Sequence, residues 1–282
     1  MERLSQAGDG LPGSASARSV LVTITTEFMR DQVDWSWTQT LVTALGCVGF
    51  PEGSARRAIA RAADSGWMES EKVGRRQRWR LTATGRAQAA QVAQSVNDER
   101  RGDAWDGRWL FVMTAIPGVR AEERHALRAG LRWIGLGPIE HGAWVTPHSD
   151  ALTAVEQLLE RLGLTEYALV VRGVIHPPAR VRDVVRSAWE LDQLEAAHRA
   201  FLPDFRSRRP TAPAEVFASL VDLSHTWRRF LLLDPALPAE LRNPGDTAAA
   251  AQQLFDDCRS RWLETARQWF ESLNEANHKT NI

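Results

Sequence analysis

The chain has 282 residues, enough for two or three domains, and 44% of them are hydrophobic and 25% charged, as in ordinary soluble globular proteins. Its 35 basic and 35 acidic side chains cancel, so a nucleic-acid partner must be bound by a local cluster of charge. Two distant cysteines, Cys47 and Cys258, exclude a disulfide framework and a zinc cluster, and no apolar run has the length of a signal peptide or a membrane span, so a cytoplasmic protein is expected.

Three helices and a short strand open the predicted order. Apolar residues recur at helical spacing over 18–30, over 38–45, where Thr38 is the expected cap, and over 52–65. Residues 33–37 alternate in polarity, so we expect a short strand there that pairs with a hairpin further along the chain. Three helices before a hairpin are the order of a winged helix-turn-helix fold.

The third helix and the hairpin after it form the predicted DNA-reading end. Pro51 suits the first turn of that helix, and Gly66 suits its left-handed end. Strands 67–70 and 77–81 are expected on either side of a turn at 73–74. The helix would enter a major groove, and the hairpin would lie on the adjacent backbone or in the minor groove.

Basic side chains mark both parts of this predicted DNA-reading end. Three arginines lie opposite the small apolar face of the helix, and further basic residues surround the hairpin turn, where Glu71 is the acidic neighbour. We predict that DNA is contacted by Arg56, Arg57, Arg61, Lys72, Arg75, Arg76 and Arg78. The alternatives are a solvated surface helix and a basic hairpin of an ordinary kind.

The middle of the chain alternates strands and helices after a charged, turn-rich boundary at 97–107. The predicted elements are strand 109–116, helix 120–133, strands 136–140 and 143–146, helix 150–162 and strand 167–175. The first and last of these strands are apolar runs and are expected to be buried. This order is the split βαβ, ferredoxin-like arrangement.

The remainder is predicted to be helical, with helices over 181–201, 215–232 and 248–273. The fold class is therefore α+β with several domains. The expected parts are a disordered tail (1–16), a winged-helix domain with a connecting helix (17–97), a ferredoxin-like middle domain (105–178), a helical C-terminal domain (179–273) and a frayed tail (274–282).

The sequence contains no motif that indicates catalysis. G-x-S-x-G, H-E-x-x-H and Walker-type loops are absent, and no two of the seven histidines have metal-ligand spacing. No catalytic residue, metal site or cofactor is therefore predicted. Ferredoxin-like Cas2 nucleases hold metal through an acidic residue at the end of the first strand, whereas residues 110–116 here carry no carboxylate. A nuclease built on the middle domain remains the alternative function, and a protein-binding scaffold is a third.

Short motifs spread over 18–270 resemble the PaaX-type repressor family, which includes the regulator of phenylacetate degradation. The motifs are RSVLVT (18–23), GW (66–67), GRR (74–76), WDGRW (105–109), LRWIG (131–135), GAWV (142–145), WEL (189–191), HTWRRF (225–230) and DPALP (234–238). Each is short, but their order and spacing make the resemblance specific. One departure is Pro51, which stands near the position where the family often has a serine cap.

The resemblance implies a homodimeric transcriptional repressor that binds double-stranded promoter DNA. Its N-terminal winged helix would read an inverted repeat, and its middle domain would be Cas2-like in fold but not in chemistry. It also implies an effector, an aryl-acyl-CoA such as phenylacetyl-CoA, that releases the protein from DNA. Such an effector must bind the DNA-free arrangement better, or it shifts nothing.

A CoA thioester brings phosphates and an acyl tail, so its site needs cations beside apolar aromatic surface. The preferred candidates are His225, Trp227, Arg228 and Arg229, and the second are Trp133 and Trp144. In a helix, His225 shares a face with the two arginines while Trp227 points elsewhere. The competing interpretation is that these tryptophans belong to the core and the arginine stems cover it.

Overall fold

The computed structural model describes residues 15–31, 33–97, 105–242, 245 and 247–279. The predicted disordered tail therefore lies outside the described residues over 1–14, as do residues 98–104 of the predicted domain boundary and the last three residues, 280–282.

Two compact units make up the chain, and each is described by itself. The first contains Met1–Asp98, Ala196–Arg229 and Thr247–Ile282, and the second contains Glu99–Glu195 and Phe230–Asp246. The helices of the C-terminal part are thus shared between the two units.

The N-terminal part of the first unit is three helices and a small sheet. Its elements are α1 (Ala17–Phe28), β1 (Ser36–Trp37), α2 (Thr38–Cys47), α3 (Glu52–Asp64), β2 (Met68–Val73), β3 (Arg76–Leu81) and α4 (Ala83–Asn97). The sheet has the order β1-β3-β2, and both pairings are antiparallel. The predicted pairing of the short strand with the hairpin is confirmed, since Ser36 lies opposite Trp79.

Local side-chain chemistry sets the start of α1. Ser16 caps this helix: its hydroxyl accepts from the Ser19 N–H, and the Ser19 hydroxyl accepts from the Ser16 N–H. Such a reciprocal capping box satisfies two N–H groups that a helix start leaves without partners. Ser16 was expected in the disordered tail, and that expectation is wrong for this residue.

Thr38 does not cap α2, contrary to the prediction. The N-cap is Trp37, with no side-chain cap bond. The Thr38 hydroxyl instead donates to the Gln77 carbonyl at 2.9 Å and accepts from the Trp79 indole N–H at 2.9 Å. The hydroxyl therefore bonds to β3 instead of to the first turn of α2, and it connects the hairpin to α2.

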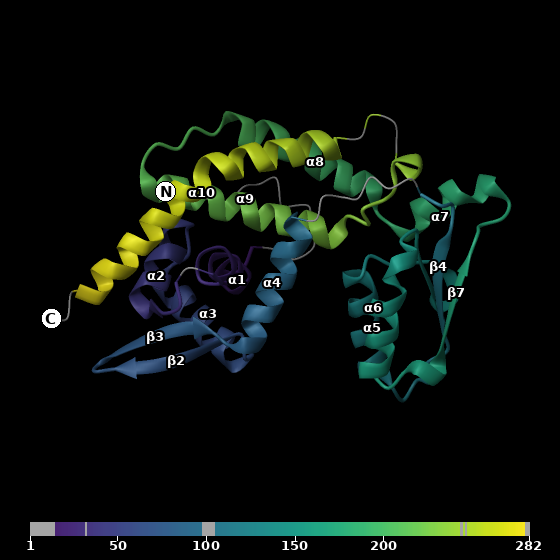
Figure 1. Cartoon of the computed structure of the whole chain (residues 1–282), viewed down its shortest axis with the longest axis horizontal. Helices are drawn as coiled ribbons and strands as arrows, with labels where there is room; N and C mark the ends of the chain where they lie inside the picture. The colour runs from purple at the N-terminus through teal and green to yellow at the C-terminus, as the bar shows by residue number, and fades with distance from the viewer. Residues whose placement is uncertain (1–14, 32, 98–104, 243–244, 246, 280–282) are drawn as a thin grey trace. The chain divides into compact units, whose positions relative to one another are not determined.

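Helices from the end of the chain complete the core of the first unit. These are α9 (Pro213–Leu233), α10 (Ala248–Lys279) and the part of α8 (Leu191–Ser207) from residue 196. The Phe28 ring of α1 lies 4.9 Å from Phe217 of α9 and 5.2 Å from Phe270 of α10. Figure 1 shows α9 and α10 along one side of α1 and α2, with the hairpin on the other side. None of the described helices is long and apolar enough to cross a membrane.

The second unit contains a four-stranded sheet with the order β5-β6-β4-β7, antiparallel throughout. Its elements are β4 (Trp109–Thr114), α5 (Ala121–Trp133), β5 (Gly137–Pro138), β6 (Ala143–Thr146), α6 (Leu152–Arg161), β7 (Ala168–Gly173) and α7 (Val181–Ala188). The predicted strand and helix order is confirmed. Leu110 and Val112 of β4 face α5 and α6, where they pack with Leu127, Leu131 and Leu158.

The last strand of the sheet is not buried as predicted. β7 is an edge strand, and its Leu169 and Val171 side chains are 59% and 38% exposed. Val170, on the opposite face, packs against the core. An unbroken apolar run does not distinguish a strand covered on both faces from one covered on a single face.

The predicted helix over 181–201 is two helices, α7 and α8. Trp189 ends α7 in an extended conformation, with φ −137°, and its side chain packs with Trp109 and Val145. This packing depends on Gly137, where an added Cβ would lie 2.7 Å from the Trp189 ring and 2.6 Å from a main-chain oxygen. Burial of the indole therefore interrupts a continuous helical pattern.

Candidate nucleic-acid interface and buried cationic cluster

Helix α3 has a buried face of small side chains and an exposed face of arginines. Ala55, Ala58, Ile59 and Ala62 are buried, whereas the three predicted arginines are exposed: Arg56, Arg57 and Arg61. Small residues let the helix approach α1 and α2 closely. Gly66 ends the chain's helical course with φ +73°, as predicted.

Weak local contacts leave the exposed arginines of α3 available. Arg56 pairs with Glu52 at 2.8 Å, and Arg57 donates to the Ser54 hydroxyl at 3.2 Å. Both partners are exposed neighbours on the same helix, and such pairs contribute only about 0.2–1 kcal/mol. A stronger acceptor, such as a phosphate or a guanine edge, can therefore replace them.

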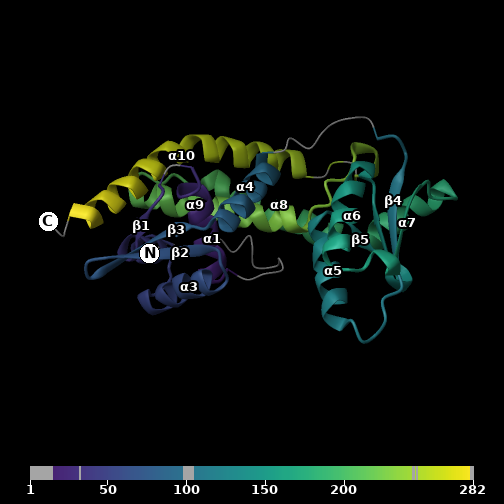
Figure 2. The ribbon, with the colours of Figure 1, turned by 60° about the horizontal axis from the view of Figure 1, so that its bottom comes forward.

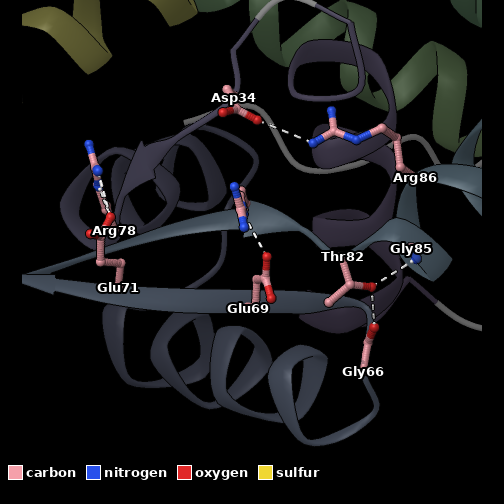
Figure 3. A network of polar contacts seen from close by, with 9 residues as sticks. Asp34, Gly66, Glu69, Glu71, Arg78, Thr82, Gly85 and Arg86 are labelled. Carbon is pink, nitrogen blue, oxygen red and sulfur yellow. Dashed lines mark hydrogen bonds and ion pairs between the residues drawn. The ribbon is translucent and has the colours of Figure 1, made fainter.

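Two of the hairpin arginines are neutralised by acidic neighbours. Arg78 donates to Glu71 at 2.7 Å and Arg80 donates to Glu69 at 2.6 Å, across the two strands. Both guanidinium groups also lie over the Trp35 ring, at 4.5 and 4.7 Å from its centre. Figure 3 shows Arg78 and Glu71 reaching toward one another. Glu69 therefore adds a second acidic partner in the hairpin.

Arg76 is also engaged. Its guanidinium lies 4.6 Å over the Trp37 ring and donates to the main-chain carbonyl of Asn277 in α10. Lys72 and Arg75 are exposed and, within the described part of the chain, form no ion pair. The positive charge that the hairpin offers to solvent is thus concentrated on these two residues at its turn.

The base of the hairpin is fixed by hydrogen bonds. The Thr82 hydroxyl donates to the Gly66 carbonyl at 2.6 Å and accepts from the Gly85 N–H at 2.9 Å. Next to it, Arg86 pairs with Asp34 at 3.2 Å. Figure 3 shows the Thr82 contacts at the right-hand end of the two strands and the Asp34–Arg86 pair above the strands. The end of α3, the start of α4 and the hairpin are therefore held in one arrangement.

The second predicted site is buried in the first unit. His225 is 6% exposed and its Nδ1 lies 3.2 Å from the Thr23 hydroxyl oxygen of α1. Arg228 donates to the same oxygen at 3.1 Å. His225 and Arg228 thus share a face of α9, as predicted, and meet α1 at one hydroxyl.

Trp227 points into the aromatic core instead. Its ring lies 4.6 Å from Phe255 of α10 and 5.7 Å from Phe201 of α8, and it is 1% exposed. Arg229, the fourth predicted member, is also buried, at 7% exposure. Trp227 therefore anchors α9, while His225, Arg228 and Arg229 bring polar and charged groups into the interior. We call these three residues the cationic cluster.

Burial changes the proton affinities in the cationic cluster. The pKa of Arg228 is lowered by desolvation, against the attraction of Glu27, which is itself paired with Arg259 at 2.8 Å. The pKa of His225 is lowered to about 4, first by desolvation and then by the charges of Arg228 and Arg229. His225 is therefore neutral at pH 7, and the arginines give the cluster its positive charge.

Another buried arginine of the same unit shows how such a charge is usually compensated. Arg208 lies 2.8 Å from Asp222 and 3.1 Å from Asp204, and these carboxylates raise its pKa against desolvation. Arg228 has a hydroxyl partner and, among the described residues, no carboxylate within ion-pair distance. A partly buried cation that lacks a paired carboxylate is costly, so Arg228 is chemically suited to an incoming anion.

The structure does not bring the second pair of candidates together. Trp144 of β6 is buried in the core between the sheet and α5–α6. Trp133, at the end of α5, is 49% exposed. No ring contact joins the two within the described residues. Among all the residues that the structure describes, no three histidine, cysteine or acidic side chains are grouped as metal ligands would be.

Comparisons with known proteins find similarity to PaaX proteins along most of the chain. Three family models match: "PaaX-like protein" over residues 16–85, "PaaX protein central Cas2-like domain" over 102–185 and "PaaX-like protein C-terminal domain" over 189–272. The transcriptional repressor PaaX of Escherichia coli (strain K12) is 28% identical over 252 residues, which cover 86% of this chain and 78% of that protein.

A solved structure has the same fold. Uncharacterized protein Rv0674 from Mycobacterium tuberculosis superposes with a TM-score of 0.57 and 21% identity, over 91% of this chain and 99% of that one. At this level of identity the likeness concerns the fold alone.

The lowered pKa of His225 predicts a pH dependence of stability. Between the ordinary value of 6.5 and about 4, the unfolded chain binds a proton that the folded chain does not, so the free energy of unfolding falls as pH falls through this range. This term lowers the free energy of unfolding by about 3 kcal/mol at pH 4, and it vanishes above pH 7. Urea unfolding of the parent and of a His225→Gln variant, at pH 7 and pH 4.5, measures it.

In the His225→Gln variant we expect a smaller loss of stability between the two pH values than in the parent. His125→Gln, at an exposed position of α5, is the control and should lose as much as the parent. Equal losses in the parent and in His225→Gln would contradict the assignment of a buried neutral imidazole.

Proposed function

Because this chain belongs to the PaaX family, we propose that it is a DNA-binding transcriptional repressor that an acyl-CoA releases from its operator. The observation that carries the proposal is the arginine face of α3 beside a basic hairpin turn, in a chain whose curated relative is named a transcriptional repressor. An enzyme has less support, since the same relative matches 86% of the chain.

We assign the DNA-binding role to residues 17–97, with the fold of a winged helix-turn-helix. Three helices followed by an antiparallel hairpin, with a short strand completing the sheet, support this assignment. α3 would enter the major groove, where bidentate arginine contacts to guanine give sequence preference. The hairpin turn would place Lys72 and Arg75 on phosphates, which give affinity without sequence preference.

The operator would be an inverted repeat bound by a homodimer, because a two-fold protein matches two half-sites related by the same symmetry. The regulated genes would serve the breakdown of phenylacetate or a related aromatic acid. The effector would be phenylacetyl-CoA or another aryl-acyl-CoA, and its anionic groups would bind at the cationic cluster of α9. The operator symmetry, the regulated genes and the effector are carried over to this chain from its resemblance to the PaaX family.

The first test is whether the protein binds the DNA upstream of its own gene. Fluorescence anisotropy with that fragment and with a shuffled fragment of the same composition, at several salt concentrations, separates specific from electrostatic binding. We expect tighter binding to the native fragment and release from it by phenylacetyl-CoA. Equal affinity for both fragments would overturn the repressor proposal.

The exposed face of α3 is expected to carry sequence preference. Loss of one bidentate guanine contact costs about 1–3 kcal/mol and relaxes one position of the site. Arg57→Ala and Arg61→Ala should therefore weaken specific binding by roughly five- to 150-fold each where such a contact is made. Arg128→Ala, an exposed arginine of α5, is the matched control. If both α3 variants keep parental affinity and site preference, α3 is not the reader.

The hairpin turn is expected to act by charge. The Lys72→Ala, Arg75→Ala double variant should weaken binding to every sequence and reduce the slope of log affinity against log salt by about one unit for each lost phosphate contact. An Arg78→Ala, Arg80→Ala variant should change the slope less, since those cations are already paired with Glu71 and Glu69. The reverse order of the two effects would place the DNA on the strands rather than at the turn.

The cationic cluster is expected to control release by the effector. An Arg228→Gln, Arg229→Gln variant removes both charges and keeps hydrogen-bonding capacity, so it should bind operator and resist phenylacetyl-CoA. The concentration of phenylacetyl-CoA that gives half release measures the effect, and Trp133→Ala is the comparison. If the glutamine variant is released like the parent while Trp133→Ala is not, the effector binds at α5.

A further inference from the structure

The sequence predicted a frayed tail from residue 274, but α10 continues to Lys279 and its last turns contact the junction between β1 and α2. Asn274 uses its whole carboxamide there. Its Oδ1 accepts from the Trp37 N–H at 3.1 Å and from the hydroxyls of Thr40 at 3.1 Å and Ser36 at 3.3 Å. Its Nδ2 donates to the Trp35 carbonyl at 2.9 Å. One side chain therefore joins the strand β1 to the start of α2.

A second asparagine, one turn later, adds contacts to the same region. The Nδ2 of Asn277 donates to the Thr40 hydroxyl at 3.1 Å, and its carbonyl accepts from Arg76 of the hairpin. The Trp37 ring is contacted by the His278 imidazole, stacked at 5.8 Å, and by the Arg76 guanidinium, at 4.6 Å. α10 thus reaches both β1 and β3.

The other contacts of α10 make its end a firm support. Phe270, one turn before Asn274, is buried against Phe28 of α1, and Trp269 lies 4.5 Å from Phe217 of α9. Figure 1 shows the end of α10 beside α2, and Figure 2 shows the same neighbourhood from another side. Because the helix is anchored in the core, its last turn can fix the elements that it touches.

The hairpin and α3, the two parts of the proposed DNA-binding surface, both contact the β1–α2 segment that Asn274 binds. β1 pairs with β3, the hairpin strand, through Ser36 opposite Trp79 and Trp37 opposite Arg78. α2 packs against α3, which carries the exposed arginines. A shift of the junction between β1 and α2 would therefore alter the angle between the hairpin and α3.

We propose that Asn274 is a positioning residue for DNA binding: from the end of α10 it fixes the junction between β1 and α2, so that the hairpin turn and α3 meet the duplex at the same time. The inference rests on the proposed repressor function for its DNA readouts. Asn277 and His278 add contacts to the same region. Asn274 is the residue to change, because its side chain alone bonds to both β1 and α2.

The experiment compares Asn274→Ala with Asn274→Asp in the full-length chain. Aspartate keeps the acceptor for the Trp37 N–H and the two hydroxyls and loses the donor to Trp35. Asn274→Asp should therefore behave more like the parent than like Asn274→Ala in hydrogen exchange and DNA binding. Ser272→Ala is the matched control, because among the described residues the Ser272 hydroxyl bonds only to carbonyls of its own helix, at Gln268 and Trp269. Unfolding curves at 20 °C establish the fraction of each variant that is folded.

Amide hydrogen exchange tests, without DNA, whether the contacts of Asn274 stabilise the hairpin. In Asn274→Ala, the amides of β1, β2 and β3 should exchange on the order of ten-fold faster or more, while those of β4 and β6 keep parental rates. Unchanged exchange in the hairpin would overturn the proposal whether or not the protein binds DNA. A uniform increase in both sheets would indicate general destabilisation and would overturn it equally.

Salt-dependent operator binding tests the consequence. If the hairpin is no longer held against DNA, Asn274→Ala should flatten the slope of log affinity against log salt, by about one unit per lost phosphate contact. The Lys72→Ala, Arg75→Ala change should then have little further effect in that background, which is the non-additivity of a double-mutant cycle. A merely smaller folded fraction lowers the apparent affinity and leaves the slope unchanged.

The outcomes separate the two proposals. If the parent protein shows no preference for the native fragment, the repressor function fails, and hydrogen exchange alone decides whether Asn274 holds the hairpin. If the parent binds its operator but the slope of Asn274→Ala is parental, or the two changes are additive, Asn274 does not position the hairpin for DNA and the inference is wrong.

Discussion

The contact of Phe28 with Phe217 and Phe270 makes the beginning and the end of the chain one core. The three rings come from α1, α9 and α10, and all three are buried. Full burial of each such side chain contributes about 1.5–3 kcal/mol, so the segment that carries α3 and the hairpin is stabilised by helices about 190 to 240 residues away in sequence. The N-terminal segment therefore has no complete core of its own, and any movement of α9 or α10 changes the packing beneath it.

Charge is arranged locally although the chain as a whole is neutral. Glu69 and Glu71 pair with two hairpin arginines, and Arg76 is bound to α10, so the hairpin shows little free charge along its strands. The exposed cations stand at the turn and on α3. Since unpaired surface cations contribute most of the salt-dependent affinity for a polyanion, this distribution concentrates DNA attraction at the places that a winged helix would present.

The parts of the structure that follow from local chemistry could be predicted from the sequence. The small face of α3, its glycine end and the pairing of the short strand with the hairpin all depend on neighbours or on alternation within a few residues. The errors share one cause, which is a partner far away in sequence. Thr38 bonds to β3 instead of capping α2, and Trp189 turns into the sheet and ends α7.

Asn274 shows the same limit most clearly. A polar segment at the end of a chain ordinarily frays, and four hydrogen bonds to residues about 235 positions earlier cannot be deduced from its composition. The grouping of His225 with Arg228 was predictable from helical spacing, but their meeting with Thr23 of α1 was not. Whether a residue is a core group or a site depends on such long-range partners.

The cationic cluster has a physical consequence for its neighbours. Arg228 is partly buried and donates to a hydroxyl, whereas Arg208, in the same unit, is compensated by two carboxylates. An anion that reached Arg228 would be a charged acceptor for the guanidinium, and where it took the N–H that now donates to the Thr23 hydroxyl it would replace that bond. Thr23 lies on α1, five residues before Phe28. Anion binding at α9 would therefore exchange a contact to α1 for a contact to the ligand, and the core that supports α3 and the hairpin would lose one of its polar ties. On the proposed function, such an exchange would be the differential interaction that an effector needs in order to favour one arrangement over another.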